Sequence, residues 1–75
     1  MLTIQWINAS KQNPNELIEQ LVFPRDTLPD AMSLARNMLA ATQARHPQSP
    51  PNGFRILDGQ GRAVGRHVLS GDANT

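Results

Sequence analysis

The sequence predicts an α+β domain in which an antiparallel four-stranded sheet, in the order ββαββ, carries one long helix packed on one face. Three observations predict it. An apolar repeat of helical period runs from Thr27 to His46, two short β-like segments lie on each side of it, and a glycine-rich turn divides the second pair. A helix between two hairpins can cover one face of the sheet that the hairpins form.

The helix is predicted over Thr27 to His46. Its apolar positions recur every three or four residues and therefore share one face; they are Leu28, Ala31, Met32, Ala35, Met38, Leu39 and Thr42. Thr27 and Asp30 have the spacing of a capping box, and Pro29 suits the first turn. Pro47 ends the helix because it disfavours the helical conformation for the residue before it.

The first strand is predicted over Leu2 to Ile7, where large apolar residues alternate with Thr3 and Gln5. We expect Trp6 to be a core anchor whose indole N–H is hydrogen-bonded, in preference to an exposed aromatic for binding.

The segment from Glu16 to Phe23 fits two structures. Asn13 to Glu16 resembles a helix cap with a proline at the first helical position, which favours a short helix. We favour a strand, because the segment ends in a β-like Val22-Phe23-Pro24 and would pair with the first strand. As a strand, it would turn Leu17, Leu21 and Phe23 toward the helix and Ile18 and Val22 away from it.

The second hairpin is predicted from Phe54 to Leu57 and from Ala63 to Leu69, around the turn Asp58-Gly59-Gln60-Gly61. Four of its residues are expected to face the helix: Phe54, Ile56, Val64 and Val68. Gly65 suggests a bulge or a close approach of another element. Residues 1–69 are thus expected to form one domain, and residues 70–75 a flexible C-terminal tail.

Composition narrows the class of protein. The chain has 75 residues, no cysteine and a formal net charge of +1, so it suits one domain without disulfides or cysteine metal sites. We expect no membrane span, because no apolar stretch approaches about 20 residues. We expect no secretory leader, because the start lacks a basic region followed by an apolar run. The expected location is the cytoplasm.

No arrangement of nucleophilic, acidic or histidine side chains in the sequence indicates catalysis. The serines lie outside any nucleophile elbow, and the two histidines, His46 and His67, read as a helix-end cation and a solvent-facing strand residue. Gly59 to Gly65 has the spacing G-x-G-x-x-x-G, but a strand follows it where a phosphate loop needs a helix. We therefore predict no catalytic, cofactor or metal residue and a protein that is not an enzyme.

Apolar residues on the sheet face away from the helix predict an interaction surface. One helix covers only one face, so the candidate interaction residues Ile7, Ile18, Val22 and Leu57 would remain in water. A second copy of the chain or another protein would cover them. The first hypothesis is thus a protein-interaction or self-association module.

Basic residues gather in the second hairpin. The candidate anion or nucleic-acid contacts are Arg55, Arg62, Arg66 and His67. Such a ribbon can neutralise phosphates. No aromatic residue is interleaved among them to stack on a base, so nucleic-acid binding ranks second.

Two short motifs carry a resemblance. They are Leu28-Pro29-Asp30 at the helix start and the stretch from Ile56 to Arg62 in the second hairpin. In these motifs and in its ββαββ order the chain resembles a group of short uncharacterised bacterial proteins. The resemblance implies the fold and brings no activity with it.

Overall fold

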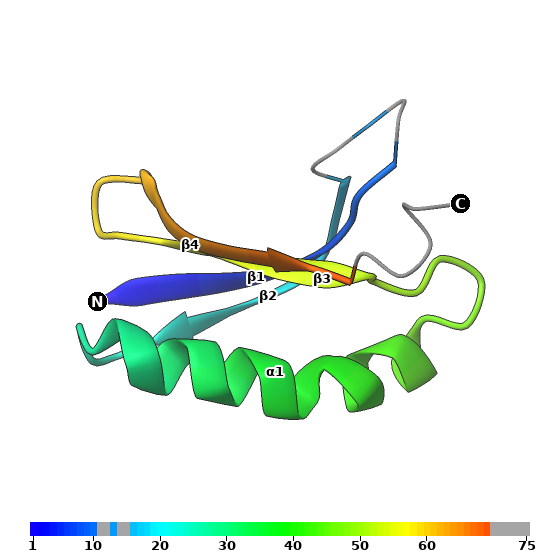
Figure 1. Cartoon of the computed structure of the whole chain (residues 1–75), viewed down its shortest axis with the longest axis horizontal. Coiled ribbons are helices and arrows are strands. Elements are labelled where there is room, and N and C mark those ends of the chain that lie inside the picture. The colour runs from blue at the N-terminus through cyan, green and yellow to red at the C-terminus, as the bar shows by residue number, and fades with distance from the viewer. Residues whose placement is uncertain (11–12, 14–15, 70–75) are drawn as a thin grey trace.

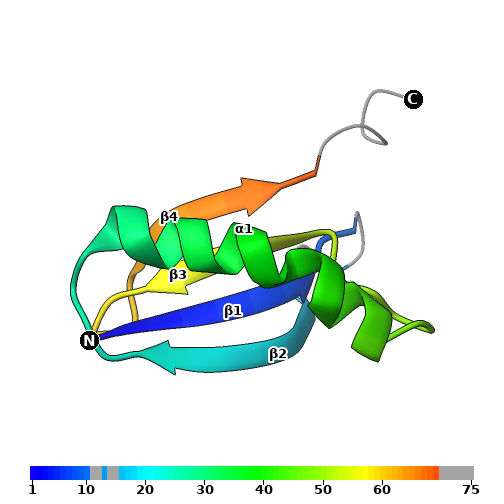
Figure 2. The same ribbon diagram turned by 90° about the horizontal axis from the view of Figure 1, so that it is seen from below.

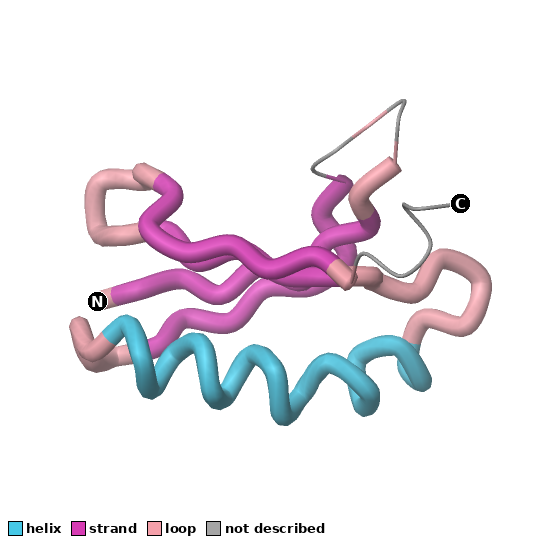
Figure 3. Tube along the Cα trace, viewed as in Figure 1, coloured by secondary structure: helices cyan, strands magenta, loops and turns pink. Residues whose placement is uncertain are grey.

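The computed structural model describes residues 1–10, 13 and 16–69. Its elements in chain order are β1 (Leu2–Asn8), β2 (Glu16–Phe23), α1 (Leu28–Arg45), β3 (Gly53–Leu57) and β4 (Ala63–Val68) (Figure 3). The predicted α+β fold of order ββαββ is confirmed, and the segment from Glu16 to Phe23 is a strand. The predicted tail, residues 70–75, lies outside the described residues.

The four strands form one antiparallel sheet in the spatial order β2-β1-β3-β4. β1 and β3 pair at its centre, so the two hairpins join into one layer. α1 forms a second layer against one face of this sheet (Figure 1). It crosses the strands diagonally, from the β4 side at its start toward β2 at its end (Figure 2).

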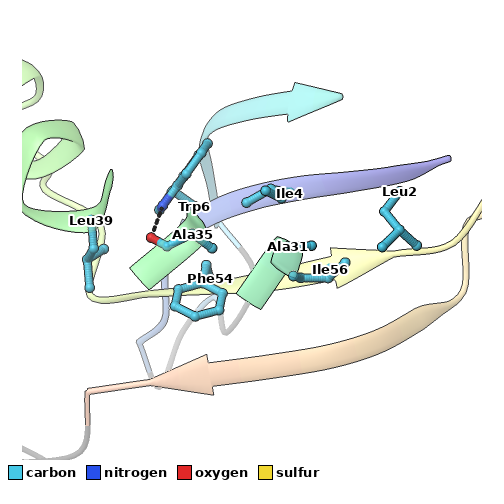
Figure 4. Packing of buried hydrophobic residues seen from close by; sticks show 8 residues of the cluster. All are labelled: Leu2, Ile4, Trp6, Ala31, Ala35, Leu39, Phe54 and Ile56. Carbon is cyan, nitrogen blue, oxygen red and sulfur yellow. Dashed lines mark hydrogen bonds between the residues drawn. The ribbon is translucent and has the colours of Figure 1, made fainter. Parts of the chain in front are cut away.

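The core lies between the sheet and α1. Trp6 is fully buried, and its indole Nε1 donates a hydrogen bond to the carbonyl oxygen of Ala35 in mid-helix (3.1 Å), as the sequence predicted (Figure 4). Ala31 and Ala35 are also fully buried, and their small side chains let the helix lie close to the strands. The whole buried cluster is Leu2, Ile4, Trp6, Ala31, Ala35, Leu39, Phe54 and Ile56.

The capping-box prediction is wrong. Thr27 is the N-cap residue in an extended conformation, but its side chain makes no capping hydrogen bond. Pro29 occupies the second helical position and has no N–H to offer, which removes one of the two donors that a cap side chain ordinarily reaches. The helix start is closed by its backbone, where Ala31 N donates to Thr27 O (3.1 Å).

Two β-bulges change which side chains face α1. In β2 the register with β1 skips Ile18, and in β4 the register with β3 skips Val64. An extra residue reverses the alternation of side chains. The predicted orientations are therefore wrong before the bulge in β2 and after the bulge in β4. Leu17 lies opposite Ile7 and so faces away from the helix, and Val68 does the same opposite Gly53.

The bulge in β4 brings Gly65 and His67 to the helix side. Gly65 lies opposite Ile56, and a Cβ there would be 3.0 Å from Met32 Sδ and 3.2 Å from Leu28 Cδ1. A valine at that point would press on the ends of these two helix side chains, and the bulge places Val64 elsewhere. The predicted close approach at Gly65 is confirmed. The His67 ring contacts the Phe54 ring, with centroids 5.6 Å apart, and His67 is half-buried, so the prediction that it faces solvent holds only in part.

The end of α1 is tied to β2 by an acidic side chain. Glu19 accepts from Arg45 Nη2 (2.6 Å) and from Arg45 Nε (3.2 Å), and its Oε1 lies 3.0 Å from His46 Nε2. The hydrogen bonds from Arg45, and to a smaller extent the one with His46, hold the pKa of the Glu19 carboxyl below its usual range. The bridge joins the C-terminal end of the helix to β2.

Gly53 leaves no room for a side chain. A Cβ at this residue would lie 2.4 Å from His67 O and 2.8 Å from Val68 Cα, both backbone atoms of the neighbouring strand. We expect Gly53→Ala to lower the free energy of unfolding by about 2 kcal/mol, the usual effect of overpacking. Gly59→Ala is the control, since its nearest atom would be Met1 O at 3.8 Å. Urea denaturation compares the two variants, and equal losses would contradict the steric argument.

Glu19 makes stability depend on pH. Its folded-state pKa is lowered, so its contribution is present above the ordinary glutamate pKa and is lost as the pH falls through the folded value. Between about pH 5 and pH 3 we expect wild type to lose stability more steeply than Glu19→Gln. At neutral pH the variant should lose less than about 1 kcal/mol, since the pair is partly exposed. Urea midpoints across this range, with Glu16→Gln as the charge-matched control, measure the effect; equal slopes for wild type and Glu19→Gln would refute it.

Candidate interaction face

The sheet face opposite α1, called the open face here, consists of three rows of side chains that cross the strands. Directly paired residues share a face, so the register defines each row. The first apolar row is Leu17, Ile7, Gly53 and Val68. The polar row is Gln20, Gln5, Arg55 and Arg66. The second apolar row is Val22, Thr3, Leu57 and Ala63.

The polar row is held together by its own hydrogen bonds. Arg55 Nε donates to Gln5 Oε1 (2.7 Å), and Gln5 Nε2 donates to Gln20 Oε1 (3.1 Å). Gln5 is 9% exposed, so these bonds also satisfy a largely buried amide. The row thereby holds the Arg55 guanidinium in place beside Arg66, which lies directly opposite it on β4.

The predicted interaction residues differ in how much surface they offer. Val22 is 53% exposed and Leu57 is half-buried, and both pair with Thr3 on the open face. Ile18 is the half-buried bulge residue of β2. Ile7 is fully buried and lies outside the helix-side cluster, so it offers no surface to a partner, contrary to the prediction.

The predicted basic residues are divided by the fold. Arg55 and Arg66 lie together on the open face. Arg62 lies in the turn between β3 and β4 and pairs with Asp58, with Arg62 Nε 3.1 Å from Asp58 Oδ2. His67 lies on the helix side against Phe54. The predicted group of four therefore reduces to a pair of arginines.

The sequence prediction missed three contributors to the open face. Gln5 and Gln20 connect the polar row, and Leu17, 48% exposed, joins the first apolar row. Gln5 could have been found, because the alternation in β1 places it on the same face as Thr3. Leu17 could not, because its position depends on the bulge at Ile18.

The described residues outside the open face show no cluster of metal-binding side chains. Within residues 1–10, 13 and 16–69, no three histidine or acidic side chains are grouped so that they could hold a metal ion. The backbone N–H groups of Arg62 and Gln60 and the Arg62 side chain hold the pKa of the Asp58 carboxyl below its usual range, which is the chemistry of a tight turn. In the same residues, no helix has the length and apolar character to cross a membrane.

Comparison with models of protein families gives no match for this chain. No curated protein and no solved structure is significantly similar to it. The resemblance to short bacterial ββαββ proteins therefore stays a prediction.

Ile7 and Val22 should differ sharply in their effect on stability. We expect Ile7→Ala to lower the free energy of unfolding by about 3 kcal/mol, because it removes three fully buried carbon atoms, one methylene and two methyl groups. Val22→Ala should change it by less than about 0.5 kcal/mol, because that side chain is largely in water. Chemical denaturation of both variants measures the difference. A loss for Val22→Ala as large as for Ile7→Ala would show that the open face is already covered.

Proposed function

We propose that this chain is a non-enzymatic protein-interaction module whose docking surface is the open face of its sheet. The observation that carries the proposal is the exposure of apolar side chains there, with Leu17 48% and Val22 53% exposed and Leu57 half-buried. Exposed apolar side chains that gather on one face favour binding to another protein. A cytoplasmic setting is part of the proposal and rests on composition alone.

The arrangement of the sheet supports this proposal. Among the described elements, α1 is the one that packs on the sheet, and it lies on the other face (Figure 1). The open face is built on strands whose register is fixed by hydrogen bonds, so a partner would meet a surface that is already ordered. A preorganised surface loses little conformational entropy on binding.

A second candidate function is nucleic-acid binding through the second hairpin. The pair of Arg55 and Arg66 on adjacent strands favours it, because two guanidinium groups can contact one phosphate backbone. The three aromatic residues of the chain are Trp6, Phe23 and Phe54, and all lie on the helix side. The open face thus lacks a platform for base stacking, and protein binding is the better supported function.

Site-specific photo-crosslinking tests the docking surface. A photoreactive phenylalanine analogue replaces Leu17 or Val22 on the open face, or Ala40, which is exposed on α1, as the control. In cells that express each variant, we expect protein adducts from the two open-face positions and none from Ala40. Equal adducts from all three positions would contradict the proposal. Adducts of twice the chain's own mass would identify a second copy as the partner, which sedimentation equilibrium at tens of micromolar would verify.

A further inference from the structure

We propose that Asn52 is a deamidation site of this protein, and that the hydrogen bonds of its own side chain hold the reaction back until one corner of the sheet opens. The inference is independent of the proposed function. It rests on the chemistry of the Asn52-Gly53 pair, on the contacts that hold this pair and on the lack of space around Gly53.

The residue after Asn52 makes it reactive. An asparagine deamidates when the backbone nitrogen of the next residue attacks its side-chain carbonyl carbon. A side chain on that next residue obstructs the attack, and glycine has none. Asn52 is the one asparagine in the sequence that a glycine follows, so its intrinsic reactivity is the highest among the asparagines of this chain.

The reaction consumes water and needs no other reagent. Gly53 N loses its proton and bonds to Asn52 Cγ, and the Cγ–Nδ2 bond breaks, so Nδ2 leaves as ammonia. The product is a cyclic succinimide. Water then opens the ring at either of its carbonyl carbons. Opening at Cγ gives aspartate with a normal backbone, and opening at the backbone carbonyl carbon gives isoaspartate, in which the chain continues through Cγ.

Hydrogen bonds hold both the side chain and the backbone of Asn52. Its Oδ1 accepts from Ala9 N (2.8 Å) and its Nδ2 donates to Ala9 O (2.9 Å), two bonds called the Asn52 clasp here. Its backbone N donates to Ile7 O (2.9 Å), and its backbone O accepts from Leu69 N (2.8 Å). The side chain must therefore leave Ala9 before its carbonyl carbon can turn to Gly53 N.

The Asn52 clasp lies where the strands end. Asn52 directly precedes β3, Ala9 directly follows β1, and Leu69 directly follows β4. The start of β3 and the ends of β1 and β4 lie at the same end of the sheet (Figure 1). The ends of a strand ladder open at a lower free energy than its centre. Asn52 is also half-buried, so water reaches it once the clasp opens, while the core stays folded.

Aspartate at this position breaks the Asn52 clasp. The donor Nδ2 becomes a carboxylate oxygen that faces the carbonyl oxygen of Ala9, so two acceptors meet without a proton between them. The Ala9 carbonyl then loses its hydrogen-bond donor, which weakens the folded state.

Isoaspartate disturbs the sheet itself. It adds an atom to the backbone just before Gly53, where a Cβ would already lie 2.4 Å from His67 O and 2.8 Å from Val68 Cα. Gly53 also lies between Ile7 and Val68 in the first apolar row of the open face. The added atom therefore displaces that row, and deamidation becomes a one-way step to a weaker domain with an altered open face.

Peptide mapping tests the protection of Asn52. Trypsin cleaves after Arg45 and Arg55, so residues 46–55 form a peptide with Asn52 as its sole asparagine, apart from the Asp58-Gly59 pair. The folded chain and the chain unfolded in guanidinium chloride are incubated at mildly alkaline pH, and mass spectrometry follows the deamidated peptide. We expect Asn52 to react roughly tenfold or more slowly in the folded chain. Equal rates would overturn the proposal.

Hydrogen exchange identifies the opening that permits the reaction. Ala9 N–H is bonded to Asn52 Oδ1, so its exchange measures how often the clasp opens. We expect the ratio of the unfolded to the folded deamidation rate to equal the protection factor of Ala9 N–H within roughly threefold. A ratio that matches the slowest amides of β1 and β3 would show that the reaction waits for global unfolding, and the local opening would be refuted.

Asn52→Asp isolates the effect of the product. We expect it to lower the folding equilibrium constant by roughly tenfold in urea denaturation. Asn37→Asp makes the same chemical change at an exposed residue of α1 and should lower the constant by less than about threefold. An unfolded Asn52→Asp beside a folded Asn37→Asp would support the same conclusion. Equal losses in the two variants would overturn the role of the Asn52 clasp in stability.

Discussion

The hydrogen bond from the Trp6 indole to the Ala35 carbonyl sets the distance between the two layers of this domain. It joins the middle of a central strand to the middle of the helix, and it satisfies the one polar atom of a fully buried ring. The bond can form only because Ala31 and Ala35 are small where the helix meets the sheet. The same closeness explains Gly65, where a side chain would touch the helix. A 75-residue chain without cysteine depends on such close packing.

The packing of the sheet against the helix also determines which residue types remain on the open face. All three aromatic residues are used on the helix side, so the opposite side is left with aliphatic residues, glutamines and arginines. The bulge that makes room for the helix at Gly65 also places Arg66 beside Arg55. The composition of the two faces is thus coupled, because a residue that turns toward the helix on β4 sends its neighbour to the other side.

The sequence predicted most of the fold because the strongest signals are local. Alternation in β1, the helical repeat from Leu28 onward and the glycine turn after Leu57 each depend on nearby residues, and the structure has all three. The bulge at Ile18 was not predicted, because no local pattern marks it, whereas Gly65 suggested a bulge or a close approach one residue from the bulge at Val64. Each bulge reverses the side-chain alternation, so Leu17 lies on the open face and His67 on the helix side, opposite to what regular alternation predicts. Of the candidate site, Val22 and Leu57 followed from alternation, whereas the pairing of Arg55 with Arg66 needed the register.

Both register irregularities fall in the outer strands β2 and β4, while the central strands β1 and β3 pair without a break. The outer strands expose backbone N–H and C=O groups, and a flat outer strand invites another chain to extend the sheet indefinitely. A bulge bends and twists the strand, so a neighbouring molecule cannot align along its full length. On this principle, the same two irregularities that orient the side chains also disfavour edge-to-edge pairing of this small domain.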